Sequence, residues 1–492
     1  MTLSILENWL FAAADKLRGP IDAADFKTYI FPLLFFKRIC DVYDDEFRQA
    51  LAQAGGDIEE ASFRENYRFL IPEGCHWKDV RERTENVGHA IAFAMRGIEK
   101  ANPSTLYEIF GDAQWANKQR LSDELLIDLI EHFSMYNLSN SNVEPDIAGR
   151  AYEYLIKKFA DESNKAAGEF YTPRAVVRLM TMILKPKEGE SVYDPACGTG
   201  GMLLEAFNFV KSNGGNTNLL HLFGQEKNLT TSSIARMNLI LHGLEDFSVV
   251  RGDTLRQPAF FEGDNLSRFD CVIANPPFSL KKWGEEVWGN DPYGRNFAGI
   301  PPKSYGDYAW VQHMIRSMAR PNGRMAIVLP QGALVRGGTE KKIRRKLVET
   351  DLLEAIVALG RNLFYGTSLA ACIAVFRFNK DEKHRGRVLL VDASHQYRQG
   401  QNKNEMLDKH VDQIYSWYEK LSNEAGVAKV ATLEEISQNG FSLNVPLYVE
   451  PIGTKEAIAV SEALTGFKKA ATLCNDSTEY LRNLLKEEGM ME

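Results

Sequence analysis

Residues 269–278, FDCVIANPPF, predict a buried parallel strand that ends in a stiff polar turn. The last residues of such a strand lie at the carboxyl edge of the sheet, where open α/β folds place their ligands. Pro276 and Pro277 fix φ and have no N–H, so the carbonyls of the turn can accept hydrogen bonds from a ligand. The Asn275 side-chain oxygen and the Pro276 carbonyl together suit an exocyclic amino group, and Phe278 suits a planar ring.

Taken alone, this turn equally suits a structural strand end with Phe278 in the core. A second motif, residues 191–201, SVYDPACGTGG, favours a ligand site. It predicts a strand, a glycine-rich turn and then a helix, whose free N–H groups can bind a carboxylate. It is neither the Gly-x-Gly-x-x-Gly dinucleotide pattern nor a phosphate loop with Lys and Ser/Thr.

Acidic residues end three successive predicted strands. Asp194 suits a cationic or amine-bearing ligand, Glu226 suits ribose hydroxyls, and Asp253 suits an adenine amino group. These acids and the glycine turn predict a pocket for an adenosine that carries an amino-acid tail. Its candidate residues are Asp194, Gly198, Thr199, Gly200, Gly201, Glu226 and Asp253.

The two motifs resemble motifs I and IV of the amino-group DNA methyltransferases that use S-adenosyl-L-methionine. Residues 168–173, GEFYTP, resemble motif X, which precedes motif I in the adenine-N6 enzymes of the γ motif order. Residues 9–19 and 35–41 and the tetrapeptide FYGT at 364–367 extend the resemblance over most of residues 1–400. The chain therefore resembles the modification (M) subunit of a type I restriction-modification system.

This resemblance implies methylation of adenine N6 in DNA, with S-adenosyl-L-methionine as the cofactor. It assigns catalysis to Asn275, Pro276, Pro277 and Phe278. It adds to the cofactor site the motif X residues Gly168, Glu169, Phe170, Tyr171, Thr172 and Pro173. The implied partners are double-stranded DNA, a specificity (S) subunit, a restriction (R) subunit and a second copy of the chain, in a complex of two M subunits with one S subunit.

Apolar periodicity divides the chain into three predicted parts. Residues 1–160 have helical spacing and predict an N-terminal all-α domain. Residues 161–424 alternate strands and helices, which predicts a Rossmann-like, doubly wound, mostly parallel α/β sheet, the methyltransferase domain. Residues 425–492 predict a C-terminal helical arm that docks on another subunit or packs on its own domain. Within the second part, the Gly-, Pro- and Lys-rich residues 279–304 predict a mobile loop that closes over the target.

Composition restricts the class of protein. The 492 residues contain no membrane-length apolar stretch, and the N-terminus has no signal-peptide pattern, so we expect a cytoplasmic protein. Six cysteines without a C-x-x-C pair and nine histidines without ligand spacing predict no metal site. The net charge of −8 is unusual for a chain that holds DNA alone. Because no base-reading module follows the predicted core, we expect a separate specificity subunit to read the DNA sequence.

Two other functions remain open at this point. Asn-Pro-Pro followed by an aromatic residue also occurs in enzymes that methylate glutamine side-chain amides of proteins, because an amide nitrogen poses the same hydrogen-bonding problem. That function does not explain the predicted N-terminal helical domain, residues 1–160. A non-catalytic assembly scaffold is the third possibility, and the intact motifs argue against it.

Overall fold

The computed structural model describes residues 2–162, 172–401, 403–450, 460–488 and 490. Met1–Val449 form one compact unit and Glu450–Glu492 a second one. None of the described helices is long and apolar enough to cross a membrane.

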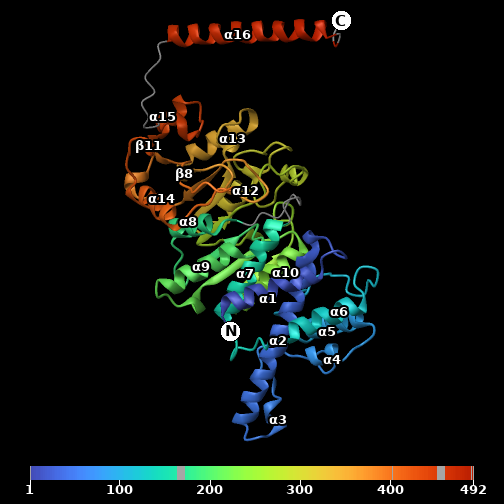
Figure 1. Ribbon diagram of the computed structural model, residues 1–492. Coiled ribbons are helices and arrows are strands. Elements are labelled where there is room, and N and C mark those ends of the chain that lie inside the picture. The colour runs from blue at the N-terminus through green and yellow to red at the C-terminus, as the bar shows by residue number, and fades with distance from the viewer. Residues whose placement is uncertain (1, 163–171, 402, 451–459, 489, 491–492) are drawn as a thin grey trace. The chain divides into compact units, whose positions relative to one another are not determined.

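The N-terminal part of the first unit is helical, as predicted (Figure 1). The chain leaves the first helix at Gly19, whose φ is +103°, before the long second helix. The first helix and the helices at 87–101 and 123–134 bury one face each, whereas the second helix is buried on all sides over residues 29–42, and together they form a single core. The helices are α1 (Leu3–Lys16), α2 (Phe26–Gln53), α3 (Ile58–Ala61), α4 (Trp77–Arg81), α5 (Val87–Ala101), α6 (Asp123–Ser134) and α7 (Pro145–Glu162).

A nine-stranded sheet forms the centre of the methyltransferase part. Its strand order is β11-β10-β8-β9-β7-β6-β1-β2-β3, and all strands except β9 and β11 run in the same direction. The central strands are continuous apolar runs because both of their faces are buried. The strands are β1 (Ser191–Asp194), β2 (His221–Glu226), β3 (Phe247–Arg251), β6 (Cys271–Ala274), β7 (Arg324–Pro330), β8 (Leu353–Leu359), β9 (Ala371–Arg377), β10 (Arg387–Ala393) and β11 (Ala428–Thr432). A small separate hairpin pairs β4 (Phe261–Glu262) with β5 (Asn265–Leu266).

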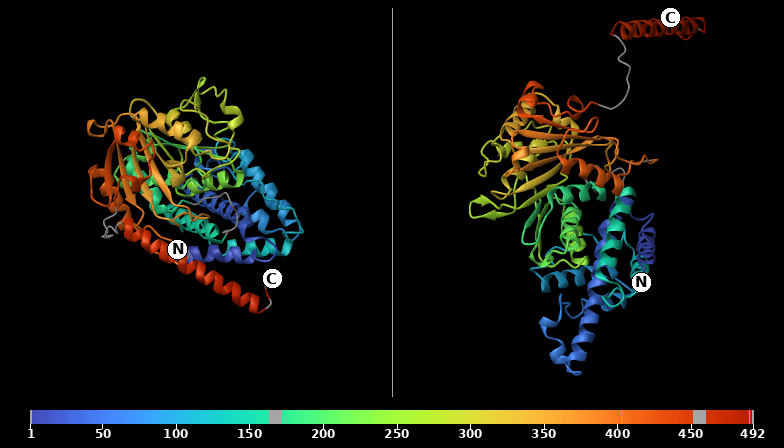
Figure 2. Two further views of the ribbon diagram at one scale, coloured as in Figure 1. Left: turned by 90° about the horizontal axis from the view of Figure 1, so that it is seen from above. Right: turned by 90° about the vertical axis from the view of Figure 1, so that its left-hand side faces the viewer.

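Helices cover both faces of this sheet, which confirms the doubly wound, mostly parallel prediction (Figure 2). The first face carries α8 (Arg174–Leu184), α9 (Gly201–Ser212) and α14 (Asp408–Lys420). The second face carries α12 (Asp307–Arg316), α13 (Gly338–Glu349) and α15 (Leu433–Gln438). Sequence alternation of strand and helix was sufficient to predict this arrangement.

Helix α10 (Leu229–Leu241) joins the helical part to the sheet. It packs on β2 and β3 and also on α7 and α2 (Figure 1). Ile234 and Met237 belong to the core of the helical part, whereas Leu239 belongs to the core beneath the sheet. The N-terminal helices and the sheet are therefore fixed to each other by a shared helix.

The C-terminal part differs from the sequence-based prediction. Residues 428–432, assigned to a helical arm beginning at 425, form strand β11 on the edge of the sheet, next to β10. AKVAT is short and contains a lysine, and it pairs only with β10, so its local pattern is weak. Further along this arm, the described residues form one long helix, α16 (Val460–Glu487).

Candidate active site

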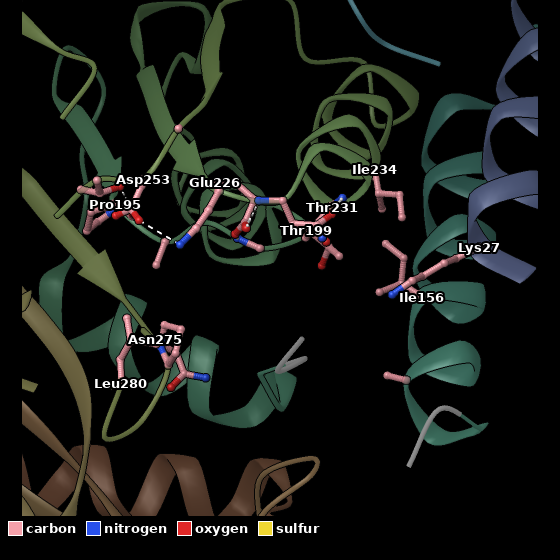
Figure 3. A pocket seen from close by; sticks show the side chains of 18 of the residues that line it. Lys27, Ile156, Pro195, Thr199, Glu226, Thr231, Ile234, Asp253, Asn275 and Leu280 are labelled. Atoms are coloured by element: carbon pink, nitrogen blue, oxygen red, sulfur yellow. Dashed lines mark hydrogen bonds and ion pairs between the residues drawn. The ribbon is translucent and has the colours of Figure 1, made fainter. Parts of the chain in front are cut away.

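A cavity of about 340 Å³ opens at the carboxyl ends of β1, β2, β3 and β6 (Figure 3). Strand β1 lies between β2 and β6, so the strand order reverses here. Such a switch point leaves a crevice between the loops that leave neighbouring strands in opposite directions. The predicted strand-tip residues Glu226, Asp253 and Asn275 all line this cavity.

The glycine-rich turn after β1 forms one edge of the cavity. Gly198 and Gly200 have φ values of +53° and +79°, a region that L side chains rarely adopt. Gly198 and Thr199 line the cavity, whereas Gly200 caps the amino end of α9 and Gly201 is its first residue. The turn thus directs the chain from the strand into a helix and exposes its backbone to a ligand.

Asp194 lies beneath this turn and is almost fully buried. Its Oδ1 accepts a hydrogen bond from the Ala196 N–H at 3.0 Å. Burial, and then the nearby Glu226, raise the pKa of Asp194 to about 8. A cationic group brought close to this carboxyl would therefore favour its ionised form. Asp194 supports the turn from below and is not among the described lining residues.

Two other carboxylates face the cavity directly. Glu226 accepts hydrogen bonds from the N–H groups of Gly198 at 3.1 Å and Asn228 at 2.8 Å, and burial raises its pKa. Asp253 forms an ion pair with Lys227 at 2.9 Å. These contacts fix both side chains at the strand tips and leave carboxylate lone pairs for a ligand.

One atom of the Asn275 amide, Nδ2, has a hydrogen-bond partner, and the other, Oδ1, has none among the described residues. Its Nδ2 donates to Thr172 Oγ1 at 2.9 Å, which determines the orientation of the amide. Its Oδ1 is buried and accepts no hydrogen bond from the residues that the structure describes. A buried acceptor without a donor costs about 1–3 kcal/mol, so this oxygen is suited to accept a hydrogen bond from a ligand N–H.

The remaining residues of the turn differ in position. Pro276 is buried, and Pro277 lines the cavity. Phe278 is half-buried, and its ring packs edge-on against Phe364 with ring centres 5.7 Å apart. Phe278 is not among the described lining residues, so the residue expected to stack on a flat ligand lies beside the cavity.

Comparisons with known proteins agree with this geometry. The N-6 DNA Methylase family model matches residues 143–457, and the HsdM N-terminal domain model matches residues 6–133. The chain is 33% identical to the type I restriction enzyme MjaVII methylase subunit of Methanocaldococcus jannaschii, over 96% of this chain and 83% of that protein. It is 34% identical to the HindI methylase subunit of Haemophilus influenzae, over 78% and 90% of the two chains. The chain belongs to the methylase (M) subunits of type I restriction enzymes.

A solved relative has the same fold. The crystal structure of the type I restriction-modification methyltransferase subunit from Streptococcus thermophilus superposes with a TM-score of 0.79 at 29% identity. The match covers 92% of this chain and all of that one. The helical part and the sheet of this M subunit therefore recur together in a relative.

Motif X, residues 168–173, lies only partly within the described residues of this M subunit. Gly168, Glu169, Phe170 and Tyr171 of motif X lie outside the described residues. Thr172 is described and holds Asn275, which connects motif X to the catalytic turn. Pro173 is the residue directly before α8.

The segment 279–304, expected to be a mobile loop, is packed in this M subunit. Trp283 and Trp288 are fully buried with ring centres 4.9 Å apart, the latter at the end of the short helix α11 (Glu285–Trp288). Asp307 Oδ1 accepts a hydrogen bond from the Ser279 N–H at 2.8 Å, which ties the end of the catalytic turn to α12. This hydrogen bond anchors the residue that follows the turn at 275–278, and both tryptophans pack into the core on the second face of the sheet.

One wall of the cavity is not predictable from local sequence. This wall comes from the helical part of the M subunit, in which no catalytic pattern was found. Its residues are Lys27, Phe31, Ile156, Phe159 and Ala160. Local sequence carries no signal for them, because apolar residues at helical spacing indicate a helix core and a single lysine belongs to no motif.

Proposed function

We propose that the cavity of this M subunit binds S-adenosyl-L-methionine and that Asn275 holds the target adenine at its edge. Membership of the N-6 DNA methylase family makes the chain an adenine-specific DNA methyltransferase, and the glutamine methyltransferase and scaffold alternatives are not favoured. The observation that supports the proposed geometry is the buried, unsatisfied Asn275 Oδ1 in a cavity lined by two carboxylates. This class of cofactor is the expected one for the family.

The described residues fit this cofactor. Glu226 accepts hydrogen bonds from the ribose hydroxyls, and Asp253 accepts one from the adenine amino group. The exposed backbone of Gly198 and Thr199 lies against the amino-acid part, and the buried carboxyl of Asp194 favours cationic charge nearby. When bound, S-adenosyl-L-methionine supplies an electrophilic methyl group on a sulfonium sulfur.

The chain's own task is to present the adenine amino group. A base in duplex DNA is stacked, so it must be flipped out at a cost of a few kcal/mol. Asn275 Oδ1 and the Pro276 carbonyl oxygen accept hydrogen bonds from the two N6–H groups of adenine. These hydrogen bonds strengthen as the nitrogen becomes tetrahedral. Phe278 stacks on the extruded ring, and Thr172 keeps the Asn275 amide in the accepting orientation. Most of the rate advantage comes from positioning, and no strong general base is needed.

Labelled methyl transfer tests the proposed function. The full chain is incubated with tritium-labelled S-adenosyl-L-methionine and DNA, with and without a co-purified specificity subunit. We expect label in DNA as N6-methyladenine when the specificity subunit is present. Label recovered on glutamine of a protein, or no transfer in any combination, would contradict the proposal.

The partners of this M subunit follow from its family. Type I M subunits work with specificity and restriction subunits. We propose that two copies of this chain bind one specificity subunit, that restriction subunits join this complex, and that the assembly binds double-stranded DNA. The net charge of −8 supports a shared DNA-binding surface over one formed by this chain alone.

We propose that α16 is the arm that docks on the specificity subunit. Phe467, Cys474 and Leu481 recur every seven residues along this helix, the spacing of a coiled-coil stripe. Phe467 is 73% exposed and Leu481 is 56% exposed. A helix with such a stripe gains stability when a second helix covers it.

Placing charges on this stripe should separate the subunits. We expect Phe467→Glu with Leu481→Glu to abolish co-purification with the specificity subunit, because two carboxylates would be buried in an apolar contact. Cofactor affinity should not change. The matched control, Thr472→Glu with Asn483→Glu, adds the same charge on the opposite side of the helix and should leave the complex intact. An intact complex with the stripe variant would show that the arm docks elsewhere.

A further inference from the structure

The helical part of the M subunit contributes a lysine to the cofactor cavity. Lys27 lies in the first turn of α2, and it lines the cavity together with Ile156 of α7. Figure 3 shows Lys27 and Ile156 on the side opposite to Pro195 and Asp253, with the Lys27 side chain extended into the cavity. The cavity is therefore bounded by two parts of the chain that are distant in sequence.

Aromatic packing holds this wall in place. The Phe31 ring lies 4.5 Å from the Tyr152 ring and 5.5 Å from the Phe159 ring, between centres. The Tyr152 hydroxyl contacts Met237 Sδ of α10 at 3.3 Å. Because α10 begins just after Glu226, the wall and the carboxylates of the cavity are parts of one rigid arrangement.

The charges of the cavity are separated along its length. Figure 3 places Asp253, Glu226, Thr199 and Lys27 in this order across the opening. Among the described lining residues, Lys227 lies at the acidic end, where it pairs with Asp253 at 2.9 Å, and Lys27 lies at the opposite end. The acidic end suits hydroxyl and amino groups, whereas the Lys27 end suits an anion.

We propose that Lys27 binds the α-carboxylate of S-adenosyl-L-methionine, which makes the helical domain part of the cofactor site. This inference rests on the proposed function, in which the nucleoside lies at Glu226 and Asp253. The carboxylate is the anionic group of that ligand, at the end of the chain away from the nucleoside. A lysine ammonium close to the positively charged sulfonium would be repelled, whereas one close to the carboxylate is attracted.

The environment of Lys27 strengthens its attraction for an anion. The side chain is half-buried, and this burial lowers the pKa of Lys27, while Asp25 acts in the opposite direction. An ammonium in a partly desolvated site gains more from a carboxylate than one in bulk water. Bound cofactor should therefore stabilise the charged form of Lys27.

Comparing the binding of two ligands, one with and one without the carboxylate, tests the role of Lys27 without measuring activity. The dissociation constants of S-adenosyl-L-methionine and of its decarboxylated analogue are measured by calorimetry on the full chain. Lys27→Met should weaken binding of the cofactor about ten- to a hundredfold, the range for a lost charge-assisted hydrogen bond. The same variant should bind the decarboxylated analogue as wild type does. Lys27→Arg should restore most of the cofactor affinity, and Lys100→Met, a change at an exposed lysine of α5, should have no effect.

Three results would overturn the inference. The first is cofactor affinity of Lys27→Met within about twofold of wild type. The second is an equal loss for both ligands, which would indicate damage to the cavity wall. The third is unchanged cofactor affinity with weaker DNA binding, which would assign Lys27 to a phosphate. If wild type binds neither ligand, the proposed function itself fails, and this outcome differs from all three.

Discussion

Asn275→Ala is expected to reduce methyl transfer to DNA by at least 10²–10³-fold, the range for a lost hydrogen-bonding group that stabilises a transition state. The amide oxygen is buried in the cavity wall and accepts no hydrogen bond from the described residues, so we expect it to accept one from the substrate. Because Asn275 lies at the edge of the cavity, away from the carboxylates, cofactor affinity should stay within about twofold of wild type. Single-turnover rates and calorimetric cofactor binding on the same preparations measure the two effects.

A change at the residue that holds the amide is the matched control. Thr172→Val keeps the shape of the side chain but removes the acceptor for Asn275 Nδ2. The amide oxygen remains, so methyl transfer should fall less than in Asn275→Ala. If Asn275→Ala methylated DNA at the wild-type rate, the catalytic assignment of this turn would be wrong.

Glu226→Ala is expected to weaken cofactor binding by about 10²-fold, from two lost hydrogen bonds to a charged acceptor at roughly 1.5–3 kcal/mol each, with partial compensation by water. Both carboxylate oxygens of Glu226 are held by backbone N–H groups at the cavity wall, so the side chain is already oriented for a diol. At saturating cofactor the rate should recover in large part, unlike that of Asn275→Ala. Equilibrium binding and the cofactor dependence of the rate separate the two classes of variant.

The control for this variant is a glutamate outside the cavity. Glu262 is exposed in the hairpin of β4 and β5, and Glu262→Ala should leave cofactor affinity unchanged. If Glu226→Ala bound the cofactor with wild-type affinity, the ribose would not bind at Glu226. Thermal melting of each variant distinguishes a lost contact from lost folding.

The strand tips of the active site were predictable from sequence. Asp194, Glu226 and Asn275 each end or directly follow an apolar run, and parallel strands bring their carboxyl ends to one edge of the sheet. The glycines after β1 and the prolines after β6 can be interpreted from sequence alone, because each residue type has its own allowed range of φ. These residues come together because the topology of a doubly wound sheet leaves few alternatives.

Other parts of the site depend on packing that no local pattern reveals. Lys27 and Ile156 are more than a hundred residues apart in the chain and meet only because α2 and α7 share a core. The glycine- and proline-rich composition of residues 279–304 does not reveal that Trp283 and Trp288 are buried. The contact of Phe278 with Phe364 depends on the loop after β8, which no pattern at the turn reveals. Tertiary contacts override composition in each case.

The central claim is that a buried amide acceptor holds the target adenine beside a methyl donor in the cavity at the β1 switch point. A structure of the full chain with S-adenosyl-L-homocysteine bound tests it most directly. We expect the ribose at Glu226, the purine amino group at Asp253, and the sulfur facing the open space in front of Asn275 Oδ1. A sulfur remote from Asn275, or a ligand bound outside this cavity, would contradict the claim.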